Sequence, residues 1–214
     1  MPRSVTIAAA AAALMAAVFP SAAHATGSGT PPPGGVSIEI ATVNGSGCPM
    51  GDPAIALAPG YSSFTLSNVS FTSSTSDQPA ERRKNCQINL YFRVPQGYTY
   101  AIAGADLGGF ASLAKGASGV VRNDYYFQGS ATTVPRSVRL VGPYNDAWQM
   151  SYDNDLVDLV YAPCGEQRNL NLNTSLQVDR GTSDPASVST ITLGDDLFGG
   201  TIVHRLAWKR CPGS

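Results

Sequence analysis

Apolar and polar residues alternate along most of the chain, which is the pattern of β-strands that bury one face. The clearest case covers residues 86–94, where every second residue from Cys86 onward is apolar. A second case covers residues 170–178, which begin with leucines alternating with asparagines. Successive side chains of a strand point to opposite faces, so each stretch predicts a strand with one buried face. The faces predicted to be buried are Cys86, Ile88, Leu90, Phe92 and Val94 in the first strand, and Leu170, Leu172, Thr174, Leu176 and Val178 in the second.

Shorter alternating runs predict further strands, separated by turn formers such as Gly142 and Pro143. In residues 63–71 the apolar phase shifts between Leu66 and Val69, which predicts a β-bulge. One local helical turn is expected at residues 110–113. Many short strands joined by short turns are typical of an all-β fold, either an antiparallel β-sandwich or a jelly roll. The further strands are predicted at residues 36–40, 63–71, 98–103, 120–128, 138–141, 159–161, 188–193 and 201–209.

The stretch 124–130 reads DYYFQGS and resembles the remains of a protease-cleavable tag. A tag remnant normally lies beside a terminus, whereas this stretch lies in the middle of the chain. Its residues also alternate between two faces, with Tyr125 and Phe127 on the same one. The stretch is therefore predicted to be a native strand that ends at Gly129.

The first 25 residues have the parts of a secretory signal peptide, namely a basic Arg3, an apolar run and a cleavage site at Ala23 and Ala25. The apolar run, residues 5–19, is shorter than the roughly 20 residues that cross a bilayer, and Pro20 ends it. Cleavage is expected after Ala25. Residues 26–35 are rich in proline and glycine and predict a flexible leader, and residues 36–214 are expected to form a single β-sandwich domain.

Composition narrows the classes of partner. Charged residues make up 14% of the chain, against a usual fraction of about 25%. Without Arg3, which leaves with the signal peptide, 13 basic and 15 acidic residues remain and the formal charge is −2. Nucleic acid and anionic membranes attract basic surfaces, so this composition excludes both. No segment after the signal peptide is apolar enough to span a membrane. We expect a secreted protein with a neutral surface, whose oligomeric state the sequence leaves open.

The four cysteines predict two disulfides, since an even number in an exported chain is the usual sign of disulfide bonds. A zinc site would need closely paired cysteines, and these are isolated from one another. Four cysteines allow three pairings. The favoured pairing joins Cys48 to Cys86 and Cys164 to Cys211, because each bond then closes a loop within one half of the chain.

Five short motifs occur in order along the chain. They are GSGCP at residues 45–49, CQINL at 86–90, YYFQG at 125–129, LNLNTSL at 170–176, and HRLAW at 204–208 followed by Cys211. Together they resemble a family of secreted bacterial and fungal proteins catalogued as a domain of unknown function. The resemblance covers nearly the whole chain after the signal peptide. It implies export and a disulfide-linked domain, and it supplies no catalytic residue.

Histidine limits the possible chemistry most, because His24 leaves with the signal peptide and His204 is the only other one. His204 alternates with Ile202, Leu206 and Trp208, so we expect a hydrogen-bonded core or edge residue rather than a catalytic base. A Ser-His-Asp triad would have to use it, and no G-x-S-x-G sequence supplies the serine. Disulfide sulfurs cannot act as nucleophiles. No catalytic residue is assigned.

The densest carboxylate cluster consists of Asp153, Asp155 and Asp158. Calcium takes six to eight oxygen ligands, which these residues and Asn154 could begin to supply. The spacing lacks the glycine and the distal glutamate of a calcium-binding loop, so a solvated turn is the alternative. No cofactor is predicted, and calcium is the one candidate metal.

Tyr144, Trp148 and Tyr152 lie near amides and a carboxylate, a combination that stacks on sugar rings and hydrogen-bonds their hydroxyls. Packing in the core or at its rim is the alternative, because most Trp and Tyr residues of a sandwich serve its core. Three hypotheses follow. The favoured one is a secreted protein that binds a polysaccharide or another cell-surface component. The others are a structural or accessory protein without a small ligand, and a glycoside hydrolase, which needs only two suitably placed carboxylates.

Overall fold

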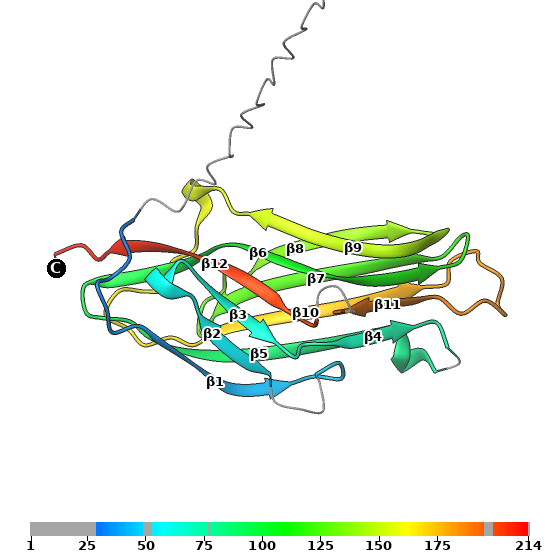
Figure 1. Ribbon diagram of the computed structural model, residues 1–214, viewed down its shortest axis with the longest axis horizontal. Helices are drawn as coiled ribbons and strands as arrows, with labels where there is room; N and C mark the ends of the chain where they lie inside the picture. The colour runs from blue at the N-terminus through cyan, green and yellow to red at the C-terminus, as the bar shows by residue number, and fades with distance from the viewer. Residues whose placement is uncertain (1–28, 49–52, 77, 195–198, 214) are drawn as a thin grey trace, which may run out of the picture.

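Two antiparallel β-sheets pack face to face in the computed structural model, which describes residues 29–48, 53–76, 78–194 and 199–213 (Figure 1). The first sheet has five strands. Their order across the sheet is β1 (Ser37–Asn44), β5 (Arg83–Arg93), β10 (Leu170–Asp179), β7 (Ser118–Phe127) and β8 (Val134–Val141). The predicted all-β class and antiparallel sandwich are confirmed.

The second sheet has seven strands and is organised by its longest one, β6 (Tyr98–Leu113). One edge of β6 pairs with β12 and then with β11, and the other edge pairs with β9. Short 3-10 helices lie at Pro59–Tyr61, Pro79–Arg82 and Leu156–Asp158. Among the described residues, no helix has the length and apolar character needed to cross a membrane. The other strands are β2 (Ala54–Leu57), β3 (Ser63–Ser67), β4 (Phe71–Ser74), β9 (Tyr144–Asp153), β11 (Thr190–Leu193) and β12 (Ile202–Arg210).

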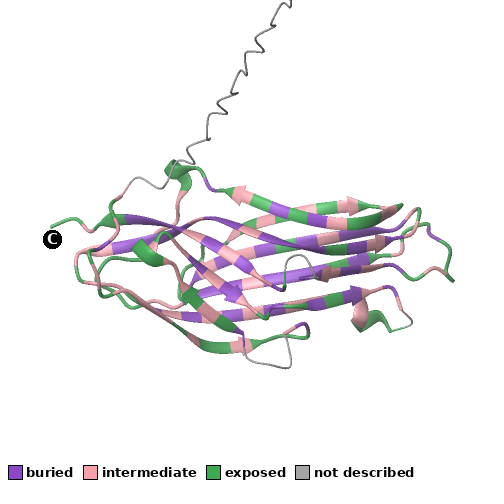
Figure 2. Ribbon diagram, viewed as in Figure 1, coloured by how far each residue is buried: buried purple, intermediate pink, exposed green. Residues whose placement is uncertain are grey.

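The core lies between the sheets and is built from the alternate residues that the sequence pattern marks as apolar. Buried and more exposed residues alternate along most strands (Figure 2). In β5 the four buried residues begin with Cys86 and end with Phe92, as predicted. Aromatic rings join the two sheets, since Phe92 of β5 stacks on Tyr100 of β6 at 4.2 Å and Tyr100 meets Phe127 of β7 edge-on at 5.5 Å. Removing these side chains from water is the main driving force for the fold.

Both predicted disulfides are present, Cys48 with Cys86 and Cys164 with Cys211. The first joins the segment after β1 to the middle of β5. The second joins the loop before β10 to the residue that follows β12, so it ties the end of the chain to the sandwich. The Cα atoms lie 4.6 Å and 5.9 Å apart, within the usual range for disulfides.

Three local predictions were wrong. Residues 63–71 form two strands instead of one bulged strand, because Asn68 adopts a left-handed φ of 62° and the chain leaves β3 for β4. Residues 159–161 form a single bridge, between Tyr161 and Ala101, and no strand. Residues 110–113 continue β6 rather than forming a helical turn. Gly109 lies just before them because a Cβ there would collide with the backbone of Thr192 in the neighbouring strand.

The DYYFQGS stretch is part of the native fold, as predicted. Tyr125 and Phe127 are buried in β7, which ends at Phe127, and Gly129 then turns the chain with a φ of 77°. Part of residues 26–35 is described and forms no strand. The predicted signal peptide, residues 1–25, lies outside the described residues.

Candidate functional site

The three aromatic residues predicted to bind a ligand lie on β9, and their spacing of four residues places them on the same side of that strand. That side faces the core. Trp148 is only 3% exposed and donates a hydrogen bond from Nε1 to the carbonyl of Thr192 at 3.2 Å. The Tyr152 hydroxyl donates to Asn123 Oδ1 at 3.1 Å, and Tyr144 is half-buried. Trp148 therefore cannot stack on a sugar ring, and the alternative of core and rim packing describes these residues.

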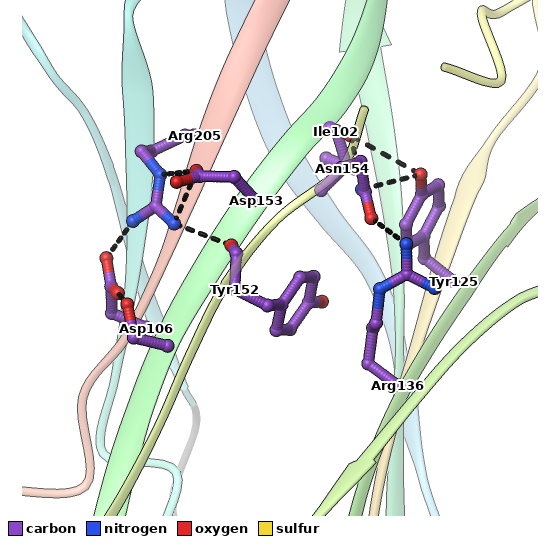
Figure 3. Close-up of polar contacts among 9 residues, drawn as sticks. Ile102, Asp106, Tyr125, Arg136, Tyr152, Asp153, Asn154 and Arg205 are labelled. Atoms are coloured by element: carbon purple, nitrogen blue, oxygen red, sulfur yellow. Dashed lines mark hydrogen bonds and ion pairs between the residues drawn. The ribbon is translucent and has the colours of Figure 1, made fainter. Parts of the chain in front are cut away.

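The predicted carboxylate cluster does not close around a metal. Asp153 forms an ion pair with Arg205 at 2.9 Å, and Arg205 also pairs with Asp106 (Figure 3). Asp155 precedes a short 3-10 turn, Asp158 is the last residue of that turn, and both are exposed. In the part of the chain that the structure describes, no group of three His, Cys, Asp or Glu residues is arranged to hold a metal ion. The solvated turn accounts for these residues better than a calcium site does.

A buried polar network closes the edge between the two sheets. Asn154 donates from Nδ2 to the Ile102 carbonyl at 2.9 Å and to the Tyr125 hydroxyl at 3.1 Å (Figure 3). Its Oδ1 accepts a hydrogen bond of 2.6 Å from Arg136 of β8, whose guanidinium also lies 5.7 Å from the centre of the Tyr152 ring. The contacts link β8 of one sheet to β6 and β9 of the other. They stabilise the sandwich at this edge.

His204 is a core residue, as predicted, but it is not hydrogen-bonded. Its ring is fully buried and stacks on Phe64 with 4.9 Å between the ring centres. Neither ring nitrogen has a hydrogen-bond partner among the described residues. The pKa of His204 is lowered to about 3, mainly by burial and also by the charge of Arg205, while Asp106 opposes the shift. The imidazole is neutral at physiological pH and out of reach of any substrate.

The most distinctive polar surface lies on the outer side of the five-stranded sheet, where amide side chains of β5 face those of β10. The register places Asn171 opposite Asn89, and Asn173 opposite Gln87. The β7 strand adds Tyr126, which also lies opposite Asn171. The other side of the same strands carries leucines and isoleucines of the core, so alternation alone directs the amides outward. We call this surface the amide face, and it consists of Asn85, Gln87, Asn89, Asn169, Asn171 and Asn173 with Tyr91 and Tyr126.

Hydrogen bonds connect the amides across three strands. Asn171 Oδ1 accepts from Asn89 Nδ2 at 2.9 Å and from Gln87 Nε2 at 3.1 Å. Asn169 Nδ2 donates to Asn89 Oδ1 at 2.7 Å, and Gln87 Nε2 also donates to the Tyr126 hydroxyl at 3.2 Å. These bonds hold the amides in fixed orientations, so little side-chain entropy would be lost when a ligand binds.

The amide face keeps donors and acceptors for a ligand. A primary amide has two N–H donors and an oxygen with two lone pairs, and the network uses only part of them. Asn171 Nδ2 and Gln87 Oε1 have no partner among the described residues, although Asn171 as a whole is only 5% exposed. Two ion pairs lie beside the face, Arg122 with Asp124 at 3.2 Å and Arg93 with Glu39 at 3.8 Å, and Arg83, on the same side of β5, has no carboxylate partner among the described residues. The amide residues themselves are uncharged and offer hydrogen bonds.

A match to a family of proteins extends over almost all of the described chain. The family model described as "Domain of unknown function (DUF4360)" matches residues 34–211. An uncharacterized secreted protein of Arthroderma benhamiae is 29% identical over 187 residues, which cover 86% of this chain and 76% of that protein. Two disulfides belong to oxidising compartments outside the cytosol. Like that relative, the chain is a secreted, extracellular protein.

Two solved structures show weak likeness in shape. A carbohydrate-binding module, TmCBM61, in complex with β-1,4-galactotriose has a TM-score of 0.26 at 10% identity, with 79% of this chain and 88% of that chain covered. The enzymatically active domain of tailspike protein 4 from bacteriophage CBA120 has a TM-score of 0.22 at 13% identity, with 83% of this chain and 19% of that chain covered. TM-scores this low do not bear on function.

Proposed function

Because the chain belongs to the DUF4360 family, whose description assigns no function, we propose one from its own surface: it is a secreted protein that binds an uncharged polysaccharide of a cell wall or cell surface through the amide face. The observation that carries the proposal is the ordered set of amides on β5 and β10 with Tyr126 beside it.

The chemistry of the amide face suits sugars. Each hydroxyl of a sugar both donates and accepts hydrogen bonds, and a primary amide offers both partners in one group. A set of amides at fixed positions therefore matches the rows of hydroxyls along a polysaccharide. The amides carry no charge, and four of the neighbouring charged groups are paired with each other, which favours an uncharged ligand over an ionic one.

Tyrosine rings supply the apolar contact that sugar binding also needs. Tyr126 is half-buried on β7, and its hydroxyl is held by Gln87, so the ring has a fixed place beside the amides. Tyr91 is covered on one side by the guanidinium of Arg93, which lies 5.2 Å from the ring centre. Tyr126 is therefore the better candidate to stack on the apolar face of a sugar ring.

We predict that Tyr126→Ala weakens binding to a retained polysaccharide about tenfold, the equivalent of about 1.4 kcal/mol. The change removes the stacking ring and one of the two hydrogen bonds that hold the Gln87 amide. The measurement is depletion of the oxidised protein from solution by insoluble cellulose, chitin, xylan and cell-wall fractions, with a binding isotherm for each variant.

Tyr144→Ala is the matched control, because Tyr144 is half-buried on β9 of the opposite sheet and belongs to the aromatic group first considered. It should bind as the unaltered protein does. Equal binding by Tyr126→Ala and the unaltered protein would exclude the amide face as the site. No retention on any polysaccharide would favour the structural or accessory role, and release of soluble sugar would identify a hydrolase.

A further inference from the structure

A cavity opens at the end of the sandwich, between the turn from β5 to β6 and the loop that precedes β10. Its volume is about 400 Å³, within the range of small-ligand sites. The described residues that line it include Phe92, Tyr98, Tyr100, Gln96, Gln167, and the ion pair of Glu166 and Arg168. None of them belongs to the amide face, so this is a separate feature of the molecule.

The walls of the cavity are fixed before any ligand binds. The Cys164–Cys211 disulfide anchors the loop to the end of β12. Thr99 Oγ1 donates to the Ala162 carbonyl at 2.6 Å, and Gln167 Nε2 donates to the Phe92 carbonyl at 2.8 Å. A covalent bond and two hydrogen bonds thus hold the loop against β5 and β6, which lowers the entropy cost of binding.

Tyr100 lines the cavity and has a hydroxyl without a partner. The residue is 2% exposed, and its hydroxyl has no hydrogen-bond partner among the described residues. Burial raises the pKa of Tyr100, so the hydroxyl stays protonated and keeps its donor at physiological pH. Leaving a buried hydroxyl unpaired costs stability, and a polar ligand in the cavity would supply the missing partner.

One arginine lines the cavity, and two further basic residues lie beside it, outside its lining. Arg168 lines it and also lines a neighbouring hollow of about 240 Å³, and it is paired with Glu166 at 2.7 Å. Lys209 and Arg210 lie 5.4 Å and 5.5 Å from the ring centres of Tyr161 and Tyr98, which line the two hollows. Neither Lys209 nor Arg210 has a carboxylate partner within the described residues. The basic residues beside the cavity therefore outnumber its one lining carboxylate, Glu166.

We propose that this cavity is a second binding site, which takes a carboxylated sugar, that is, a uronate. Aromatic rings of Phe92 and Tyr98 provide apolar contact, the Gln96 amide and the Tyr100 hydroxyl provide hydrogen bonds, and the basic residues attract the carboxylate. The site stands on residues different from those of the amide face, so either site can fail its test without the other.

The test is isothermal titration of the full secreted protein with digalacturonate and, in parallel, with neutral digalactose. We expect digalacturonate to bind and digalactose to bind at least about tenfold more weakly. Tyr100→Phe removes one oxygen from the cavity and should weaken digalacturonate binding about tenfold. Because that oxygen is unpaired in the free protein, the variant should fold and be at least as stable as the unaltered protein.

The paired change Lys209→Gln and Arg210→Gln tests the charge. It should weaken digalacturonate binding and reduce its dependence on salt, while Tyr126→Ala should leave it unchanged. Absence of digalacturonate binding, or binding that Tyr100→Phe does not alter, would overturn the site. Equal affinity for the two disaccharides would overturn the assignment of a carboxylated ligand.

Discussion

Replacing Cys164 and Cys211 together by serine should lower the free energy of unfolding by about 4 kcal/mol. The disulfide closes a loop with a sequence separation of 47 residues, and removing it gives the unfolded chain more conformations. Cys164 is exposed and Cys211 half-buried, so serine at these positions adds little further cost. The measurement is urea unfolding of the variant and of the oxidised protein, with both midpoints and slopes determined.

The second disulfide provides the comparison for this prediction. Its sequence separation of 38 residues is similar, but Cys86 is buried in the core. Replacing Cys48 and Cys86 by alanine should therefore cost at least as much as the first change, since it also leaves a small cavity. If replacing Cys164 and Cys211 lowers the free energy of unfolding by less than about 1 kcal/mol, this disulfide does not stabilise the fold as described.

Acidification from pH 7 to pH 4 should destabilise the protein by about 3 kcal/mol through His204 alone. The histidine titrates near 6.5 when unfolded, whereas its pKa is about 3 in the buried site. Between these values the unfolded chain binds a proton that the folded chain does not, so the free energy of unfolding falls as the pH falls. Above pH 6.5 both states are neutral at this position and the effect is absent.

His204→Phe isolates this contribution, because phenylalanine has a similar size and can keep the stack on Phe64. Carboxylates titrate alike in both proteins, so the difference between their stability curves reports the histidine. Between pH 7 and pH 4, the free energy of unfolding of the variant should fall by about 3 kcal/mol less than that of the unaltered protein. Phe64→Leu should disturb the same stack and keep the pH dependence. Parallel curves for His204→Phe and the unaltered protein would show that the imidazole is not buried as described.

The sequence predicts those strands that bury one face and leave the other toward solvent. In β5 the buried residues are those expected from the alternation. In β10 the expected core residues are buried too, but Asn171 and Ser175 of the outer face are also buried, because neighbouring strands and side chains cover them. The pattern was less informative in β6, where the glycines before Phe110 resemble turn formers. In the structure Gly109 allows the backbone of a neighbouring strand to approach closely, a tertiary requirement that no local pattern contains.

The candidate site could be predicted only in part. Outward-facing amides at Gln87, Asn89, Asn171 and Asn173 follow from the alternation. Their meeting on one surface depends on the pairing of strands that are about 80 residues apart in sequence, as the bond between Asn169 and Asn89 shows. Composition and spacing do not determine that register.

The sequence contains a pattern that favours burial of the aromatic residues of β9. Tyr144, Trp148 and Tyr152 share their face with Met150, an apolar residue, whereas the other face carries Asn145, Gln149 and Ser151. That alternation favours burial of the aromatic face, which the structure shows for Trp148 and Met150. The neighbouring amides and carboxylate suggested a sugar site because they lie close in sequence, although most of them point away from the rings.

The most direct test of the account is a heteronuclear NMR titration that follows the side-chain amide signals of asparagine and glutamine. Soluble oligosaccharides of each retained polysaccharide would be added to the labelled, oxidised protein. The account predicts that the signals of Gln87, Asn89 and Asn171 shift, while the exposed Gln149 on β9 of the opposite sheet does not. Binding that shifts Gln149 and leaves the three amides unchanged would contradict the amide face as the site.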